Sequence, residues 1–210
     1  DNASGVATLL EAARALADAS SGKRPRRPVV FVAVTGEEKG LLGSRYHALH
    51  PTFTGTMVAD VNVDMFMPLH PLKSLVAYGA DESTLKAPLE AVAREHGLAL
   101  QPDREPNRVL FVRSDQYSFV RVGVPALALK FGYEPGSPEE QAHRTWIHDR
   151  YHAPSDDLQQ PVDREAAARF NRFVVDFLRR VADAPAAPAW NADSFFRRFA
   201  ARPAAPASKP

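Results

Sequence analysis

Five side chains that can bind metal ions or carry protons stand out from their surroundings in this sequence. Glu37 and Glu38 directly follow one apolar run, and Asp64 lies near the end of another. His152 lies in the polar stretch RYHAPSDDL, and Asp1 precedes an amphipathic segment. An ionised aspartate in an apolar strand must be paired or bind a cation, because desolvation of its charge is otherwise costly. Carboxylate and imidazole ligands suit a hydrolytic site with one or two Zn²⁺ ions, in which a spare carboxylate can act as general base.

The carboxylates also have structural interpretations when each is considered alone. Thr35 and Glu38 have the spacing of a helix capping box, and Asp1 suits a helix N-cap. Asp64 fits a core aspartate whose hydrogen bonds are satisfied within the protein. The catalytic interpretation therefore depends on the joint occurrence of all five residues.

Three histidines compete for the role of the imidazole ligand. His152 has an acid, Asp156, four residues further on, and metal-bound imidazoles usually donate their second N–H to a carboxylate or a carbonyl. His143 and His148 have no acid at that spacing. The sequence therefore favours His152, although a surface histidine in a polar loop is the structural alternative.

The composition excludes several functional classes. The 210 residues include 26 Lys and Arg and 25 Asp and Glu, so no basic excess indicates binding to nucleic acid or to an anionic membrane. The chain has no cysteine, which excludes disulfides and thiolate metal ligands. No apolar run approaches the roughly 20 residues that a membrane-spanning helix needs.

Alternating strands and helices must position these side chains. Apolar, β-branched runs predict strands at 29–35, 56–66, 74–79, 109–112 and 125–132. Helical periodicity and caps predict helices from about Val6 to Leu16 and at 37–49, 83–97 and 164–182, and a small helical piece is expected within 114–123. The stretch 133–157 is predicted as a long polar loop.

This order of elements predicts an α/β protein. We expect a three-layer α/β/α sandwich with a mixed, mostly parallel central sheet. In such sheets ligands bind at the C-terminal ends of the strands, where the carboxylates lie. We expect one catalytic domain over 1–183, followed by a Pro/Ala-rich tail over 184–210 with a short docking helix at 190–200.

The motifs resemble those of the M28 family of zinc-dependent exopeptidases, chiefly aminopeptidases. The similarity is carried, in the family's order, by DNASG (1–5), TGEEKGLLGS (35–44), NVDM (62–65), RSDQYSFVRVGVPAL (113–127) and RYHAPSDD (150–157). Together these motifs cover nearly all of residues 1–183.

The resemblance implies a role for each site residue. Asp1 would bridge two zinc ions, Glu38 and His152 would complete one metal site, and Asp64 would bind the other ion. Glu37 would be the general base that takes a proton from the metal-bound water or hydroxide nucleophile. 

Further residues take supporting roles by the same resemblance. Tyr151 would help to stabilise the tetrahedral oxyanion, with loop packing as its structural alternative. Ser114 and Asp115 match a structural or substrate-lining pair. Phe66, Met67 and Phe131 are candidates for the wall of a specificity pocket, or else core residues.

The sequence departs from the family at its start. Family members carry a histidine ligand in an H-x-D motif shortly before the DNASG aspartate, and nothing precedes Asp1 here. We therefore expect that the sequence lacks the family's N-terminal strands and that, of two zinc ions in a complete site, this segment holds at most one well. We also expect weak peptide hydrolysis by the segment alone.

Peptides are the substrates that the resemblance implies, and it indicates a periplasmic or secreted protein. A carboxypeptidase or a glutaminyl cyclase on the same fold is an alternative, and Arg113 or Lys130 could supply the basic pocket that a carboxypeptidase needs. A non-catalytic binding or receptor-like module is a second alternative. Retention of Glu37 beside the predicted ligands argues against the binding module.

Overall fold

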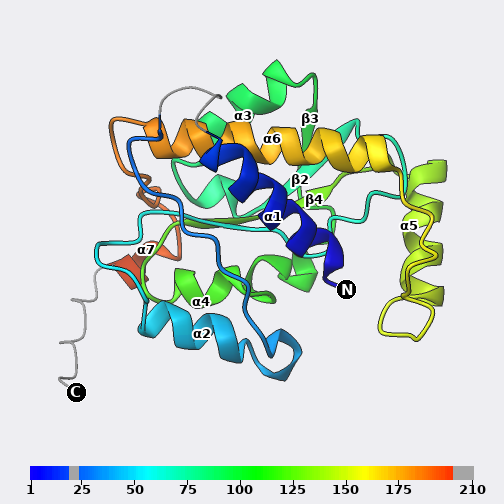
Figure 1. Ribbon diagram of the computed structural model, residues 1–210, viewed down its shortest axis with the longest axis horizontal. Helices are drawn as coiled ribbons and strands as arrows, with labels where there is room; N and C mark the ends of the chain where they lie inside the picture. Colours follow the sequence, from blue (N-terminus) through cyan, green and yellow to red (C-terminus); the bar gives the residue numbers. More distant parts are fainter. Residues whose placement is uncertain (19–23, 201–210) are drawn as a thin grey trace.

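A four-stranded mixed sheet lies between two layers of helices in the computed structural model, which describes residues 1–18 and 24–200 (Figure 1). The strands are β1 (Asp60–Asn62), β2 (Ser74–Tyr78), β3 (Ala99–Gln101) and β4 (Ala126–Phe131), and their order across the sheet is β1-β4-β2-β3. The pairs β1–β4 and β2–β3 are parallel, whereas β2 and β4 are antiparallel. The predicted α/β sandwich with a mixed sheet is confirmed.

The helices divide between the two faces of the sheet (Figure 1). One face carries α1 (Ala3–Ala17), α3 (Lys86–Glu95) and α6 (Arg164–Asp183), and the other carries α2 (Leu42–Leu49) and α4 (Gln116–Val120). Helix α5 (Pro138–Asp149) lies at one end of the sheet, and α7 is a single turn (Arg197–Ala200). Short 3₁₀ turns occur at η2 (Glu37–Lys39), η3 (Ala80–Glu82), η4 (Pro106–Arg108) and η5 (Leu110–Val112). No described helix is long and apolar enough to cross a membrane.

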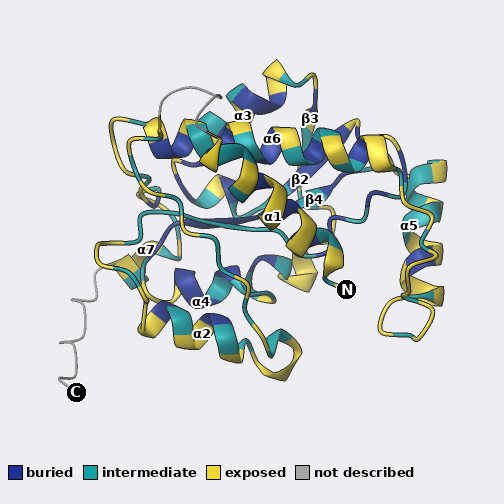
Figure 2. Ribbon diagram, in the orientation of Figure 1, coloured by how far each residue is buried: buried dark blue, intermediate teal, exposed yellow. Residues whose placement is uncertain are grey.

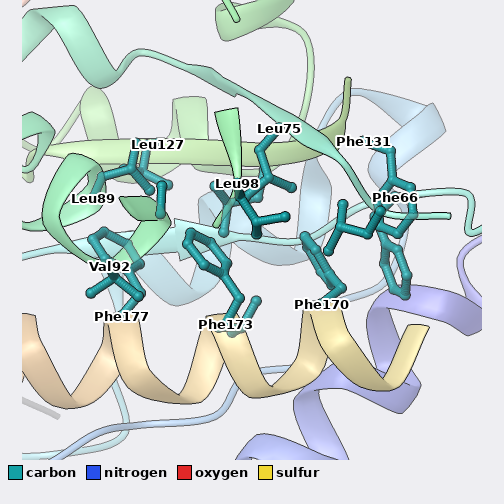
Figure 3. Packing of buried hydrophobic residues seen from close by; sticks show 14 of the residues in the cluster. Phe66, Leu75, Leu89, Val92, Leu98, Leu127, Phe131, Phe170, Phe173 and Phe177 are labelled. Atoms are coloured by element: carbon teal, nitrogen blue, oxygen red, sulfur yellow. The ribbon is translucent and has the colours of Figure 1, made fainter. Parts of the chain in front are cut away.

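Helix α6 forms the main core against the sheet (Figures 2 and 3). Its apolar residues recur at three- and four-residue spacing, so that they share one face, and Phe170, Phe173 and Phe177 are fully buried. The Asp163 side chain caps the helix by accepting a hydrogen bond from the Ala166 N–H at 2.9 Å. The predicted helix at 164–182 is confirmed.

The predicted strand at 29–35 is wrong. The segment carries no strand, and no main-chain hydrogen bond joins 29–34 to the sheet in the described part of the chain. Val30 is 46% exposed, so the run is not covered on both faces. An apolar, β-branched sequence favours a strand, but a strand also needs a neighbour to receive its main-chain hydrogen bonds.

The predicted helix at 37–49 is divided in two. The 3₁₀ turn η2 ends at Gly40, and Gly40 and Leu41 have left-handed φ angles of 100° and 58° before α2 begins. The 3₁₀ turn begins after Gly36, also left-handed, without a side-chain cap. The capping box of Thr35 and Glu38 is therefore not formed, and this structural interpretation of Glu38 is wrong.

Two other segments differ from prediction. Residues 110–112, expected to lie in a strand, form η5, while the third strand of the chain is the unpredicted β3. The expected loop at 133–157 contains α5, whose Ser137 cap accepts a hydrogen bond from the Glu140 N–H at 3.2 Å. Helix α5 buries Trp146 but otherwise exposes most of its length, so it has little apolar periodicity to predict it.

The remaining elements follow the prediction with shorter bounds. The strand expected at 56–66 is limited to β1, and the helix expected at 83–97 to α3, with Gly97 at φ 62° just beyond its end. Strands β2 and β4 fall within the predicted ranges 74–79 and 125–132.

The chain after α6 returns to the body of the domain. Trp190 is 7% exposed, and its indole N–H donates to the Gly123 carbonyl at 2.9 Å. Phe196 and Phe199 pack on a second apolar cluster with Phe111, Val120 and Ala126. Helical structure within 190–200 is limited to α7, and the part of the predicted tail at 201–210 lies outside the described residues.

Candidate metal centre

Three of the predicted metal ligands meet at one point. His152 Nε2 lies 3.2 Å from Asp1 Oδ2 and 3.0 Å from Glu38 Oε1. Asp1 lies two residues before α1, Glu38 lies in η2 and His152 lies in the turn after α5, so segments far apart in sequence converge here. In the described chain no other group of three or more histidine, aspartate or glutamate side chains has this arrangement.

The DNASG segment is tied to the chain around Asp64 by one side chain. Asn2 Oδ1 accepts hydrogen bonds from the Gly5 N–H at 2.9 Å and the Met65 N–H at 3.0 Å. Asn2 Nδ2 donates to the Val63 carbonyl at 3.2 Å. A Cβ at Gly5 would lie 2.2 Å from the Val63 oxygen, so a glycine is needed for this close approach.

Asp64 lies two residues beyond β1 and outside the group of three. Its Oδ2 accepts a hydrogen bond from Ser114 Oγ at 3.0 Å. Asn62 Nδ2 donates to the same hydroxyl at 3.2 Å and to Gln116 Oε1 at 2.8 Å. A partly buried polar network therefore orients the Asp64 carboxylate, and Ser114 takes part as a positioning residue.

Glu37 is the partly buried acid of the site. Burial raises the pKa of Glu37, and the negative charges of Asp64, Asp115 and Glu38 raise it further. The charge of Lys130 acts in the opposite direction. Glu37 lines the same cavity as Asp64 but does not belong to the group of three. A general base that is separate from the metal ligands would have such a position.

Tyr151 lies beside the histidine ligand. Its ring stacks on the His152 ring with centroids 3.8 Å apart and planes inclined by 28°. Burial, followed by the charges of Glu38, Asp64 and Glu37, raises the pKa of Tyr151. Its phenol therefore keeps its proton and can donate a hydrogen bond into the site.

The two competing histidines lie elsewhere. His148 is highly exposed, and its Nδ1 lies 2.5 Å from Asp149 Oδ1. Burial, together with the positive charge of Lys130, lowers the pKa of His143 to about 4. Neither residue joins the group of three, so the preference for His152 agrees with its position.

The expected role of Asp156 is not found. Asp156 Oδ1 accepts a hydrogen bond from Gln160 Nε2 at 3.0 Å. No hydrogen bond joins Asp156 to His152 among the described residues. Asp156 therefore does not orient the imidazole.

All six predicted site residues line one cavity of about 1160 Å³. Phe66, Met67 and Phe131 also line it, but Phe66 and Phe131 belong to the main core as well. Phe66 stacks on Phe170 with centroids 4.2 Å apart (Figure 3). The cavity therefore lies directly against the core face of the sheet.

The sequence does not reveal the contacts of two residues that position the main chain of the site. Asn2 carries the signal of a helix cap, yet its side chain also holds the main chain at Val63 and Met65. Lys130 follows an apolar run like a strand-end surface lysine, yet its ammonium contacts the carbonyl oxygens of Asp64 and Met65. Sequence spacing gives no indication of such long-range contacts.

The group of three has the chemistry and dimensions of a zinc site. Zinc accepts carboxylate oxygen and imidazole nitrogen at about 2.0–2.2 Å, so ligands of one tetrahedral ion lie roughly 3.4 Å apart. The separations of 3.2 and 3.0 Å from His152 Nε2 to the two carboxylates are close to this value, and all three ligand atoms lie within 4.8 Å of one another. Asp1, Glu38 and His152 therefore fit a zinc ion.

Comparison with known proteins points to the same chemistry. Residues 1–178 match the family described as Peptidase family M28. The chain is 29% identical over 181 residues to the probable leucine aminopeptidase 2 of Aspergillus fumigatus. That similarity covers 79% of this chain and 34% of the relative, so the chain spans about a third of the relative's length.

Proposed function

The chain belongs to peptidase family M28, and on that basis we propose that it is a zinc-dependent aminopeptidase. The observation that carries the proposal is the convergence of Asp1, Glu38 and His152, with Glu37 beside them in one cavity. Membership of the family supports peptidase activity with peptides as the substrates. The relative's name supports removal of an N-terminal residue such as leucine.

In this proposal Asp1, Glu38 and His152 would hold a zinc ion. When bound, zinc lowers the pKa of a water molecule toward about 7 and polarises the scissile carbonyl. Asp64 is the remaining acid suited to a second metal ion, and Ser114 fixes its orientation through the hydrogen bond to Oδ2.

Glu37 handles the proton in this mechanism. Its carboxylate takes the proton of the attacking water and later delivers it to the nitrogen of the leaving amine. A partly buried carboxylate among other acids suits this role, because a raised pKa makes it a stronger base.

Tyr151 donates a hydrogen bond to the oxygen of the carbonyl under attack. The stacking of its ring on His152 fixes the ring relative to the ligand. Because its pKa is raised, the phenol remains a donor throughout the working pH range.

Hydrolysis of leucine p-nitroanilide by the zinc-loaded protein tests the proposal. We expect Glu37→Gln to lower kcat by about 10²- to 10⁴-fold, the usual contribution of a general base, while bound zinc stays unchanged. Glu90→Gln, which alters an exposed glutamate on α3, is the matched control and should keep full activity.

Two results would overturn the proposal. Equal turnover by Glu37→Gln and the parent would remove the base. Zinc binding without cleavage of any N-terminally free peptide would instead indicate the non-catalytic binding module.

A further inference from the structure

Lysine and arginine side chains line the cavity beside the acids of the candidate metal centre, and three of the six are paired with glutamates. The pairs are Arg104 with Glu134 at 3.5 Å, Arg108 with Glu105 at 2.9 Å and Arg144 with Glu140 at 2.8 Å. Their charges are therefore largely neutralised within the protein.

Lys130 is not available to a ligand either. It is partly buried, and its ammonium contacts the main-chain oxygens of Asp64 and Met65. The ammonium therefore supports the main chain after β1, and this use weakens the case for Lys130 as the basic pocket of a carboxypeptidase.

Arg113 differs from these residues. Its side chain is exposed at the wall of the cavity and makes no hydrogen bond or ion pair with the described residues. Among the lysines and arginines of the cavity wall, Lys39 is the one other described residue in this position. An unpaired guanidinium at a catalytic cavity is a ready partner for an anion.

Arg113 also lies next to a residue that positions one of the acids. The following residue, Ser114, donates its hydroxyl hydrogen to Asp64 Oδ2 at 3.0 Å. Arg113, Ser114 and Asp64 line the same cavity as Tyr151 and His152. Arg113 therefore lies on the Asp64 side of the cavity that holds the candidate metal centre.

We propose that Arg113 binds the carboxylate of the substrate residue that follows the scissile bond. Consecutive Cα atoms lie 3.8 Å apart, so this carboxylate lies about one residue from the carbonyl under attack. The guanidinium presents paired N–H groups that match a carboxylate. The preferred substrates are then dipeptides, or peptides with an acidic residue after the cleaved bond, and this inference rests on the proposed aminopeptidase function.

Binding of uncleavable analogues provides the first test. The zinc-loaded protein is titrated calorimetrically with Leu-Gly in which the scissile amide is reduced to CH₂–NH, and with the C-terminal amide of the same compound. We expect the carboxylate form to bind about tenfold more tightly, and Arg113→Met to abolish the difference. Lys39→Met, which removes the other unpaired charge, should preserve it.

Kinetics separate the two sources of the carboxylate. Leu-Gly should show a KM several-fold below that of Leu-Gly-amide, with kcat little changed. A lower KM for Leu-Asp-amide than for Leu-Asn-amide would show that Arg113 also binds an acidic side chain in the residue after the scissile bond. A preference in the first pair alone assigns Arg113 to the C-terminal carboxylate, and a preference in both assigns it to either carboxylate.

The outcomes distinguish this inference from the proposed function. Equal binding of the two analogues, or equal losses in Arg113→Met and Lys39→Met, would overturn the role of Arg113 even if leucine p-nitroanilide is cleaved. Cleavage of N-acetyl-Leu-Gly but not of Leu-Gly-amide would keep the role of Arg113 and replace the aminopeptidase by a carboxypeptidase.

Discussion

The core under α6 and the edge of the cavity are held together by different interactions. Phe170, Phe173 and Phe177 are fully buried and pack among many other apolar side chains, as Figure 3 shows. The cavity edge depends on individual polar contacts, above all those of Asn2 and Ser114. Burial of apolar area is the main source of stability, whereas polar contacts contribute little net free energy but fix geometry.

The main chain shows the same contrast. Among the described residues, five that are not glycine have positive φ, and three of them, Met65, Met67 and His152, line the cavity. Left-handed conformations cost roughly 1–2 kcal/mol per residue. The domain therefore combines a core of regular elements with a strained edge that presents the candidate ligands, and changes in the two regions should affect different properties.

Phe173→Ala should produce the largest loss of stability. Removal of this fully buried ring from α6 is expected to lower the free energy of unfolding by about 3–5 kcal/mol. The zinc affinity of the molecules that remain folded should not change. Urea denaturation and zinc titration below the transition check both statements, and a parallel loss of zinc affinity would contradict the separation of the two regions.

Asp60→Asn should change how stability depends on pH. Burial, followed by the charge of Asp115, raises the pKa of Asp60 to about 7, and its Oδ2 has no hydrogen-bond partner in the described chain. Folded Asp60 thus keeps its proton over a range in which the unfolded chain, with a pKa of 3.8, has lost it. The stabilisation is complete below about pH 3.8 and is lost as the pH rises through about 7.

The pH dependence of the unfolding free energy therefore shows whether Asp60 is protonated in the folded protein. Between pH 5 and pH 8 the parent should lose roughly 2–3 kcal/mol that Asp60→Asn does not lose, since one pKa unit corresponds to about 1.4 kcal/mol. Asp193→Asn, at an exposed position, is the control and should follow the parent. Identical pH profiles for Asp60→Asn and the parent would show that Asp60 is ionised in the fold.

Asn2→Ala should have the smallest effect on stability and a clear effect on the site. The substitution removes two hydrogen bonds that join the start of α1 to residues 63 and 65 and a third that caps α1 at Gly5, and we expect a loss of about 1–2 kcal/mol. Zinc affinity should fall about tenfold, as is typical when an outer contact of a metal site is lost. Asn191→Ala, which removes a hydrogen bond to the Asp81 carbonyl, should lower stability without changing zinc binding.

The sequence predicts the core better than the cavity edge because the apolar residues of the core recur at regular spacing along the chain. The spacing of Phe170, Phe173 and Phe177 specifies one face of a helix, and the apolar runs of β2 and β4 specify buried strands. The same rule fails at 29–35, where the run lacks a partner strand among the described residues, and at α5, whose few buried residues leave no pattern.

The sequence predicts the candidate ligands of the site, but it does not predict the hydrogen bonds that position them. Asp1, Glu38 and His152 were expected to meet because of their chemistry and the family's motifs, and they do meet. The contacts of Asn2 with residues 63 and 65 and of Lys130 with Asp64 join residues more than 60 positions apart. No local pattern encodes such contacts.

The stoichiometry and affinity of zinc binding test the central claim most directly. Calorimetric titration of the metal-free protein should show one zinc ion bound per chain, with affinity reduced at least 100-fold in His152→Ala. His148→Ala, four residues away on an exposed side chain, should bind zinc as the parent does. Equal zinc affinity in His152→Ala and the parent would contradict the assignment of Asp1, Glu38 and His152 as the metal centre.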